Sequence, residues 1–422
     1  MNKLQNLIYK LEKHHKKKID LSLDRTFNLL KKLGNPQDKL KNVVNVVGTN
    51  SKASMAYSLK SILNHAGYNC NLYTSPHLQS FTERFIFDDN EIKEEILIEL
   101  LKDIQKVLGD DNASLFEILT CAYLKYAENF KDNVNIVEAG LFFQFDSTNV
   151  FKNNLMTLIG VIHTDHLQWL KNKTIDGIIH EKTSKLLNSN IFINKQLNEE
   201  IREKIEKALI NNSSNKYFFG KEFNISKQEN GFIHYQDNMG EIILPEPSVL
   251  GDHQLYNIST SIAASRKIFN VKDENIKKGI TNIKLKGRLQ ELHSGKLKDI
   301  SGKNRLIIDG GHNESSSISI SSWIKQQHQD VHLICGMMKD KEHYKFMKHF
   351  KGIVRSITLI DIPNQEGSIS KEELKDKLNA LKLEINLSSS IQDAVNLNSK
   401  HQDTICLIAG SLYLVGEVLN LN

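Results

Sequence analysis

The chain has 422 residues, of which 40% are hydrophobic and 25% are charged. These proportions are typical of a globular protein, and the length favours two domains over a single core. The net charge of +5 is slight and spread out. The one dense basic run, residues 13–18, is typical of a solvated helix end, so we expect no nucleic-acid partner. No apolar run approaches the length of a membrane span, so we expect no membrane partner.

The cysteines are far apart and embedded in apolar segments. None belongs to a CxxC pair or to another metal-ligand spacing, so we expect buried free thiols in a reducing cytoplasm. The sequence has no coiled-coil stripe, which favours a monomer. The cysteines are Cys70, Cys121, Cys335 and Cys406.

Residues 1–34 are predicted to form two helices. The second helix, from about Leu23, would place Phe27, Leu30 and Leu33 on one face and end at Gly34.

A β-branched run at 43–47 predicts a buried strand that stops at Gly48, and an amphipathic helix is predicted from about Ser54. A tight loop between a strand and a helix N-terminus directs backbone N–H groups and the positive end of the helix dipole at one spot, which suits phosphate. Lys52 would add a positive charge, and the Ser54 hydroxyl could reach a magnesium ion. The helix side chains expected to point inward are Met55, Leu59, Ile62 and Leu63.

Two residues depart from the common phosphate loop. Ser51 stands where Gly usually precedes the Lys, and Ala53 separates Lys52 from Ser54. If position 51 requires a positive φ, Ser costs about 1–2 kcal/mol that Gly would not. Ala53 lies at a helix start, where Ala is a good helix former. Alone, the motif also fits a strand–turn–helix whose Lys is merely solvated.

Strands are expected near 70–73, 134–138 and 156–163, with helices at about 91–108 and 114–130. This alternation predicts a largely parallel α/β sheet, in which ligands bind beyond the carboxyl ends of the strands. Each polar residue there has an ordinary alternative, because a strand-end carboxylate often caps a helix and a lone histidine is usually structural. The residues expected along this rim are Lys52, Ser75, Glu138, Asp165 and His166.

Residues 220–245 predict short strands and turns, and a second α/β pattern begins near 284–290. Its strands are expected at 305–308, 331–335, 356–359 and 404–409. The first two would end in polar loops at 309–313 and 336–341.

In chain order, these loops resemble the folylpolyglutamate synthase/dihydrofolate synthase branch of the Mur ligases. Each motif alone is weak to moderate evidence, but their order and spacing hold across almost the whole chain. The matching segments are 33–36, 47–54, 73–78, 116–120, 138–141, 146–149, 165–166, 181–182, 253–254 with Asn257, 287–288, 309–313, 339–341 and 410–417.

The chain departs from the family pattern in three places. Ser51 and Ala53 replace the two loop glycines, which bears on catalytic rate. Phe142-Phe143-Gln144 stands where Gly-Gly-Arg is usual, which bears on substrate contacts. Lys171 follows Trp169-Leu170 where a Gly is usual.

The resemblance implies a P-loop-type, mostly parallel sheet flanked by helices (the Mur ligase central domain) in residues 1–286. It implies a smaller Rossmann-like α/β domain in residues 287–422. The first would bind ATP and the pterin, and the second would bind glutamate.

The activity implied is ATP-dependent ligation of L-glutamate to a folate-type carboxylate. The acceptor would be dihydropteroate, tetrahydrofolate or both, activated as an acyl phosphate with release of ADP. The implied cofactors are ATP and Mg²⁺ at two sites, with Lys182 carrying a carbamate.

The resemblance assigns roles residue by residue. It implies catalytic roles for Lys52, Lys182 and His312. The implied ATP-binding residues are Gly48, Thr49, Asn50, Ser51, Lys52, Ala53, Ser54, Asn257, Arg288 and Asp309. The implied metal ligands are Ser54, Glu138, His166 and Lys182. The implied substrate-binding residues are Ser75, Pro76, His77, Phe116 and Ser411.

Two other functions stay open. The Phe142–Gln144 stretch also fits a Mur-type ligase for another carboxylate. Ser51 and Ala53 also fit a catalytically weakened folate- or nucleotide-binding protein. A P-loop kinase or GTPase ranks lower, because segments 165–182 and 309–313 would then have no role.

Overall fold

The computed structural model describes residues 3–14, 22–228 and 231–422. Most of the basic run at 13–18 lies outside the described residues. The chain divides into two compact units, one of residues 1–248 with 255–283, the other of residues 249–254 with 284–422. No helix among the described residues is long and apolar enough to cross a membrane.

Within its described residues, the first unit is built on an eight-stranded sheet in the order β4-β3-β2-β5-β1-β6-β7-β8. The strands from β2 to β8 along this order run parallel, and β3 and β4 pair antiparallel at one edge. The β-branched strand at 43–47 is therefore central, as a fully buried parallel strand should be. The strands are β1 (Val43–Val47), β2 (Cys70–Tyr73), β3 (Phe85–Phe87), β4 (Asn90–Glu91), β5 (Val134–Glu138), β6 (Met156–Ile159), β7 (Asn190–Ile193) and β8 (Asn215–Phe218).

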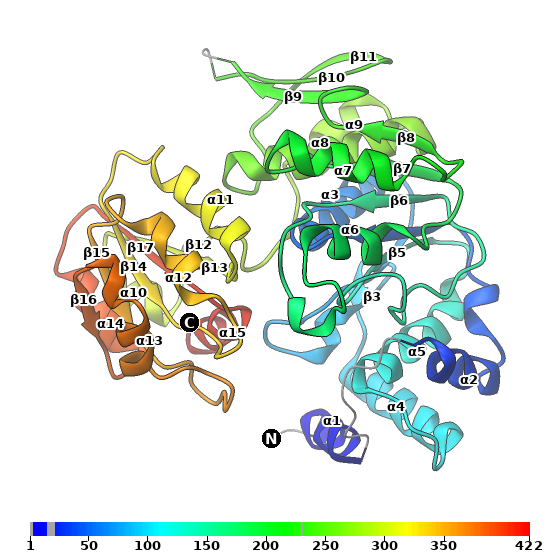
Figure 1. The fold of residues 1–422 in the computed structure, drawn as a ribbon, viewed down its shortest axis with the longest axis horizontal. Coiled ribbons are helices and arrows are strands. Elements are labelled where there is room, and N and C mark those ends of the chain that lie inside the picture. The colour runs from blue at the N-terminus through cyan, green and yellow to red at the C-terminus, as the bar shows by residue number, and fades with distance from the viewer. Residues whose placement is uncertain (1–2, 15–21, 229–230) are drawn as a thin grey trace. The chain divides into compact units, whose positions relative to one another are not determined.

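Helices cover both faces of this sheet, with α6 and α7 in front of it and α3 behind it in Figure 1. They are α1 (Lys3–His14), α2 (Asp24–Lys32), α3 (Lys52–His65), α4 (Glu94–Leu108), α5 (Leu115–Ala127), α6 (Ile175–Thr183), α7 (Glu199–Ala208), α8 (Asp252–Phe269) and α9 (Asp273–Ile280). Short 3₁₀ turns lie at Pro36–Asp38, Phe81–Arg84, Glu128–Phe130 and Leu167–Trp169.

The phosphate-loop helix confirms the expected inward face, because Met55, Leu59, Ile62 and Leu63 are all buried. The helix begins at Lys52, two residues before the predicted start.

The predicted face of α2 is wrong at Phe27, whose side chain is 44% exposed. The buried stripe is instead Thr26, Leu29, Leu30 and Leu33, which has the i, i+3, i+4, i+7 spacing of one helix face. Phe27 lies one position outside that stripe.

The predicted strand at 156–163 is also too long, since β6 ends at Ile159. At the next residue, a Cβ on Gly160 would lie 2.4 Å from the Asn50 carbonyl oxygen. The chain beyond Ile159 pairs with the phosphate loop, where both the Thr49 and Asn50 N–H groups donate to the Val161 carbonyl.

Within residues 220–245, three strands form a small antiparallel sheet in the order β11-β10-β9, which lies apart from the main sheet at the top of Figure 1. This confirms the predicted short strands. Arg266 of α8 binds Asp237 of β10 with 3.3 Å between Nε and Oδ2. The strands are β9 (Phe223–Lys227), β10 (Ile233–Asp237) and β11 (Gly240–Leu244).

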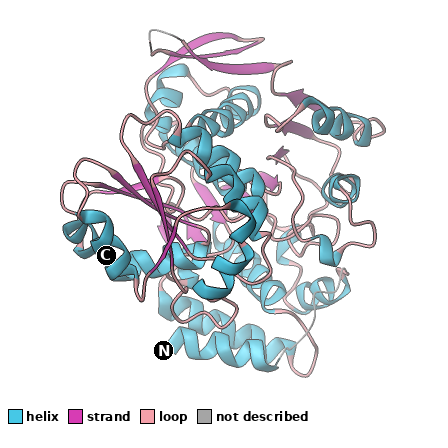
Figure 2. Cartoon of the chain, turned by 60° about the vertical axis from the view of Figure 1, so that its left-hand side comes forward, coloured by secondary structure: helices cyan, strands magenta, loops and turns pink. Residues whose placement is uncertain are grey.

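The second unit has a mixed sheet in the order β12-β13-β17-β14-β15-β16. In Figure 2 all strands of the chain are magenta and all helices are cyan, and helices flank the strands. The four predicted strands are confirmed to within one residue, but the three-residue strands β12 and β16 were not predicted. The strands are β12 (Gln290–Leu292), β13 (Arg305–Asp309), β14 (Val331–Cys335), β15 (Ser356–Leu359), β16 (Ile385–Leu387) and β17 (Ile405–Ala409). The helices are α10 (Lys296–Ser301), α11 (Glu314–Ile324), α12 (His343–Met347), α13 (Lys371–Lys377), α14 (Ile391–Ser399) and α15 (Leu412–Leu421), with 3₁₀ turns at Lys348–Phe350 and Asn379–Leu381.

Candidate active site

The loop from Gly48 to Ser51 turns sharply between β1 and α3. Gly48 has φ +156°, and a Cβ there would lie 2.8 Å from the Asn50 carbonyl oxygen. Ser51, the N-cap of α3, has φ +74° and makes no side-chain capping bond. The first turn of α3, which includes Ala53 and Ser54, therefore begins without a side-chain cap, and its N–H groups can serve an anion.

Lys52 and Glu138 meet at the carboxyl ends of the two central strands. Val46 of β1 pairs with Glu138 of β5, and the Lys52 Nζ lies 3.9 Å from a Glu138 carboxylate oxygen. The Lys52 Nζ also donates to the Thr49 carbonyl at 3.3 Å. Ser54 is buried in the first turn of α3. A carboxylate and a hydroxyl are hard oxygen donors, so Glu138 and Ser54 fit a magnesium ion accompanied by phosphate oxygens.

The loop after β2 is tied to the same carboxylate, because the Ser75 N–H donates to Glu138 at 3.2 Å. Pro76 follows through a cis peptide bond and is exposed. The His77 Nδ1 accepts a hydrogen bond from the Arg84 Nε at 3.0 Å. Burial, and then Arg84, lower the pKa of His77 to about 3. His77 is therefore neutral at pH 7, with its Nε2 carrying the proton.

Phe116 lies beside the end of β5. Its ring stacks on Tyr73 with 6.1 Å between centroids, and a Cβ on Gly140 would lie 2.6 Å from its ring carbons. Gly140 must therefore lack a side chain for Phe116 to occupy this position.

Lys182 of α6 is buried beneath the phosphate loop. Its Nζ donates to the Gly48 carbonyl at 2.9 Å and to the Leu141 carbonyl at 3.1 Å. Phe142 places its ring centroid 5.7 Å from the same nitrogen. Burial lowers the pKa of Lys182 to about 7, with Lys52 as a smaller contribution in the same direction. A substantial fraction of the amine is therefore neutral at pH 7.

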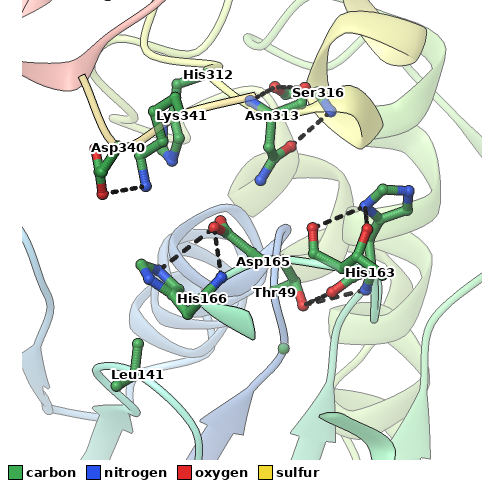
Figure 3. A network of polar contacts seen from close by, with 12 residues as sticks. Thr49, Leu141, His163, Asp165, His166, His312, Asn313, Ser316, Asp340 and Lys341 are labelled. Carbon is green, nitrogen blue, oxygen red and sulfur yellow. Dashed lines mark hydrogen bonds and ion pairs between the residues drawn. The ribbon is translucent and has the colours of Figure 1, made fainter. Parts of the chain in front are cut away.

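His166 lies on the segment after β6, with 3.8 Å between its Nε2 and an Asp165 carboxylate oxygen. Its backbone N–H donates to the same carboxylate at 2.9 Å (Figure 3). The described residues contain no cluster of three or more His, Cys, Asp or Glu side chains arranged for a metal. A second metal there would need oxygen ligands from other sources, and a carbamate on Lys182 would be one.

Asn257 of α8 is buried, and its Oδ1 accepts a hydrogen bond from the Asn194 Nδ2 at 2.7 Å. The Asn194 Oδ1 accepts from the Lys195 N–H at 2.8 Å. Because a backbone N–H can only donate, this chain of bonds fixes the orientation of both amides. Sequence reasoning missed Asn194, although its place just after buried strand β7 on the same rim is a usable signal.

In the second unit, Asp309 at the end of β13 is buried and holds the loop that follows. Its carboxylate accepts from the Leu289 N–H at 2.8 Å and from the Gly311 N–H at 2.6 Å. Burial raises the pKa of Asp309, while Arg288 opposes that shift. The Nδ1 of His312 lies 2.9 Å from the Gly310 carbonyl, so it carries the proton and leaves Nε2 as the acceptor of the neutral ring.

Two further predicted residues of the second unit have structural contacts. Arg288 donates from Nη1 to the Gly287 carbonyl at 3.0 Å. Ser411 is the N-cap of α15 and accepts from the Tyr413 N–H at 3.2 Å. Such a cap contributes about 1 kcal/mol and leaves the hydroxyl proton available to a ligand.

The two departures from the usual phosphate loop should have opposite effects on stability. We expect Ser51→Gly to raise the free energy of unfolding by about 1 kcal/mol, because it relieves a side chain at φ +74°. The matched Ala53→Gly variant lies within α3, so it should lower that free energy by about 1 kcal/mol. Urea unfolding of both variants measures this, and two changes of the same sign would contradict it.

The fold and this rim define a nucleotide-binding α/β protein with a second α/β unit. The family model for the C-terminal domain of dihydrofolate synthetase matches residues 293–421. A dihydrofolate synthase/folylpolyglutamate synthase of Bacillus subtilis is 26% identical, with 94% of each chain covered. A dihydrofolate synthetase of Saccharomyces cerevisiae is 24% identical, covering 96% of this chain and 98% of the relative.

Solved structures match the whole chain as well. The E. coli FolC complex with DHPP and ADP has a TM-score of 0.85 at 25% identity, covering 99% of this chain and 97% of that one. A Yersinia pestis bifunctional enzyme complexed with AMPPNP and Mn ion has a TM-score of 0.85 at 23% identity, covering 100% and 98%. The chain therefore belongs to the dihydrofolate synthase/folylpolyglutamate synthase family, and it is an ATP-dependent ligase.

Proposed function

We propose that this ligase joins L-glutamate to a folate-type carboxylate, accepting both dihydropteroate and tetrahydrofolates. The observation that supports it best lies at the carboxyl ends of β1 and β5. There Glu138 pairs with Lys52 and accepts a hydrogen bond from the Ser75 N–H. A lysine amine, a carboxylate of the kind that binds Mg²⁺ and the start of the loop predicted to bind substrate therefore lie close together. Full-length similarity to enzymes named for both activities supports the same function.

In the proposed reaction, a carboxylate oxygen of the acceptor attacks the γ-phosphorus of ATP, and the bond from that phosphorus to ADP breaks. The neutral glutamate amine then attacks the acyl carbon, the bond from that carbon to the phosphate oxygen breaks, and the nitrogen loses one proton to solvent as the amide forms. Phosphoryl transfer needs charge stabilisation more than covalent help, which Lys52 and the α3 N–H groups would supply. With Nδ1 bonded to the Gly310 carbonyl, the Nε2 of a neutral His312 ring would be an acceptor that orients the incoming amine.

A magnesium ion bound by Ser54 and Glu138 would neutralise part of the negative charge of the phosphates. We place the second ion with His166 and a carbamate on Lys182. The neutral amine is the form that combines with carbon dioxide, and the low pKa of Lys182 makes that form abundant. Phe116 and the loop of Ser75 would contact the acceptor, while Asn257, Arg288 and Asp309 would contact the nucleotide. A reducing cytoplasm suits this proposal, since all four cysteines are buried free thiols.

The test is ADP release by the purified chain with ATP, magnesium and bicarbonate. Dihydropteroate, tetrahydrofolate and a peptide carboxylate are compared as acceptors, each with and without glutamate. We expect turnover that needs glutamate together with either folate-type acceptor. Turnover with the peptide carboxylate alone would replace this proposal by another Mur-type ligase. Tight ATP binding with no turnover on any acceptor would favour a binding protein.

A further inference from the structure

Thr49 joins the phosphate loop to the segment that follows β6. Its hydroxyl donates to the His163 carbonyl at 2.9 Å and accepts from the His163 N–H at 3.1 Å. Its backbone N–H donates to the Val161 carbonyl at 2.8 Å. Figure 3 shows the paired bonds between Thr49 and His163. The side chain thus extends the β1–β6 ladder by one step beyond the backbone pairing.

These bonds use both donors that Thr49 possesses. A threonine has one hydroxyl proton and one backbone N–H, and here both are donated within the protein. Phosphate oxygens only accept hydrogen bonds at neutral pH. Because both donors of Thr49 are already used, Thr49 has none left to donate to a phosphate. The role that fits Thr49 is therefore different from that of the neighbouring loop residues.

The segment held by Thr49 leads directly to Asp165 and His166. His163 is two residues before Asp165, whose carboxylate accepts the His166 N–H at 2.9 Å. The bonds of Thr49 therefore fix the distance between the phosphate loop and the residues proposed for the second metal. A second contact supports this join, because the Gln196 Oε1 accepts from the Ile162 N–H at 3.0 Å on the other side of the segment.

We propose that Thr49 is a positioning residue. It holds the segment that carries His166 in a fixed position relative to the phosphate loop, and it does not contact the nucleotide. This inference rests on the proposed function for its link to metal. It predicts that loss of the hydroxyl weakens the coupling between metal and nucleotide while leaving metal-free nucleotide binding nearly intact.

The test compares Thr49→Val, which keeps the shape but lacks the hydroxyl, with Thr49→Ser, which keeps the hydroxyl. Thr164→Val is the matched control, because it removes a neighbouring hydroxyl whose contact is with the His163 ring, at 3.3 Å, and not with the phosphate loop. Hydrogen exchange of the His163 amide reports the bond itself. Calorimetry of ADP binding with and without Mg²⁺ reports the coupling, and Mn²⁺ titration in the presence of ADP checks it with a second ion.

For Thr49→Val, we expect about tenfold faster exchange at His163 and about tenfold weaker Mg²⁺ dependence of ADP binding, the size of one lost hydrogen-bond pair. Metal-free ADP affinity should change by less than about threefold, and Thr49→Ser and Thr164→Val should resemble the wild type. An equal loss of ADP affinity with and without metal would overturn the proposal, as would unchanged metal dependence or a Thr49→Ser variant as impaired as Thr49→Val. These are binding readouts, so they decide the role of Thr49 even if the wild type ligates no glutamate, a result that would overturn only the proposed function.

Discussion

Replacing Lys52 by Met should reduce turnover by at least about a thousandfold, because a preorganised charge at the transferring phosphoryl group is worth several kcal/mol. Lys52 lies 3.9 Å from Glu138 at the start of α3, where no other lysine of the loop can replace it. Single-turnover formation of ADP in the presence of a folate-type acceptor and glutamate measures the effect. ADP binding should weaken far less than the rate, since the charge matters most in the transition state.

The matched control is Lys60→Met, two turns further along α3. Lys60 pairs with Asp89, which lies in the turn between β3 and β4 rather than at the carboxyl end of a central strand. An ion pair with one exposed partner contributes about 1 kcal/mol or less, so this variant should keep nearly normal turnover. Equal losses in the two variants would show that the helix, and not the charge at Lys52, is responsible.

Replacing Lys182 by Ala should also reduce turnover by at least about a thousandfold, and a short carboxylate such as acetate should restore part of it. Ala leaves a cavity in which acetate can supply the anionic oxygens proposed for a carbamate. Lys182→Met fills that cavity with an apolar side chain, so it should be equally inactive and show no rescue. Rescue of both variants, or of neither, would contradict a carbamate at this position.

The pH dependence of the wild type follows from the same lysine. Its pKa in the folded protein, about 7, lies below the ordinary 10.5, so the unfolded chain binds the proton more tightly. Between pH 10.5 and 7, falling pH therefore favours unfolding, and below pH 7 this contribution is constant. In buffer depleted of carbon dioxide, activity restored by a fixed bicarbonate addition should rise through pH 7, because the reactive neutral amine increases there.

The sequence predicted the buried centre of the fold better than its margins. Four of the five residues at 43–47 are valines and the whole run is buried, so its length and β-branched residues indicate a strand. The three-residue strands β12 and β16 are too short for any periodicity to show, and they form because neighbouring strands offer an unpaired edge. Phe27 was misplaced because a nine-residue helix has few positions from which to fix a face.

The rim itself could be predicted, because strand ends are local features and parallel pairing aligns them. Which residues of the rim form hydrogen bonds with one another could not be predicted. Nothing in the sequence indicates that the Lys182 amine lies beneath Gly48, or that the Thr49 hydroxyl is shared with His163. These contacts join residues more than a hundred positions apart, so they depend on the assembled sheet rather than on any local pattern.

The central place of β1 also determines when this protein can acquire its function during synthesis. Val44 pairs with Ile136 on one side and with Met156 on the other, so both neighbours leave the ribosome roughly a hundred residues after β1 does. Until then β1 has two unpaired edges, and such strands are prone to aggregate. Nascent chains that end before β6 should therefore depend on chaperones. Because ADP would bind only chains with a complete sheet centre, its presence should protect full-length chains from proteolysis and leave shorter ones unprotected.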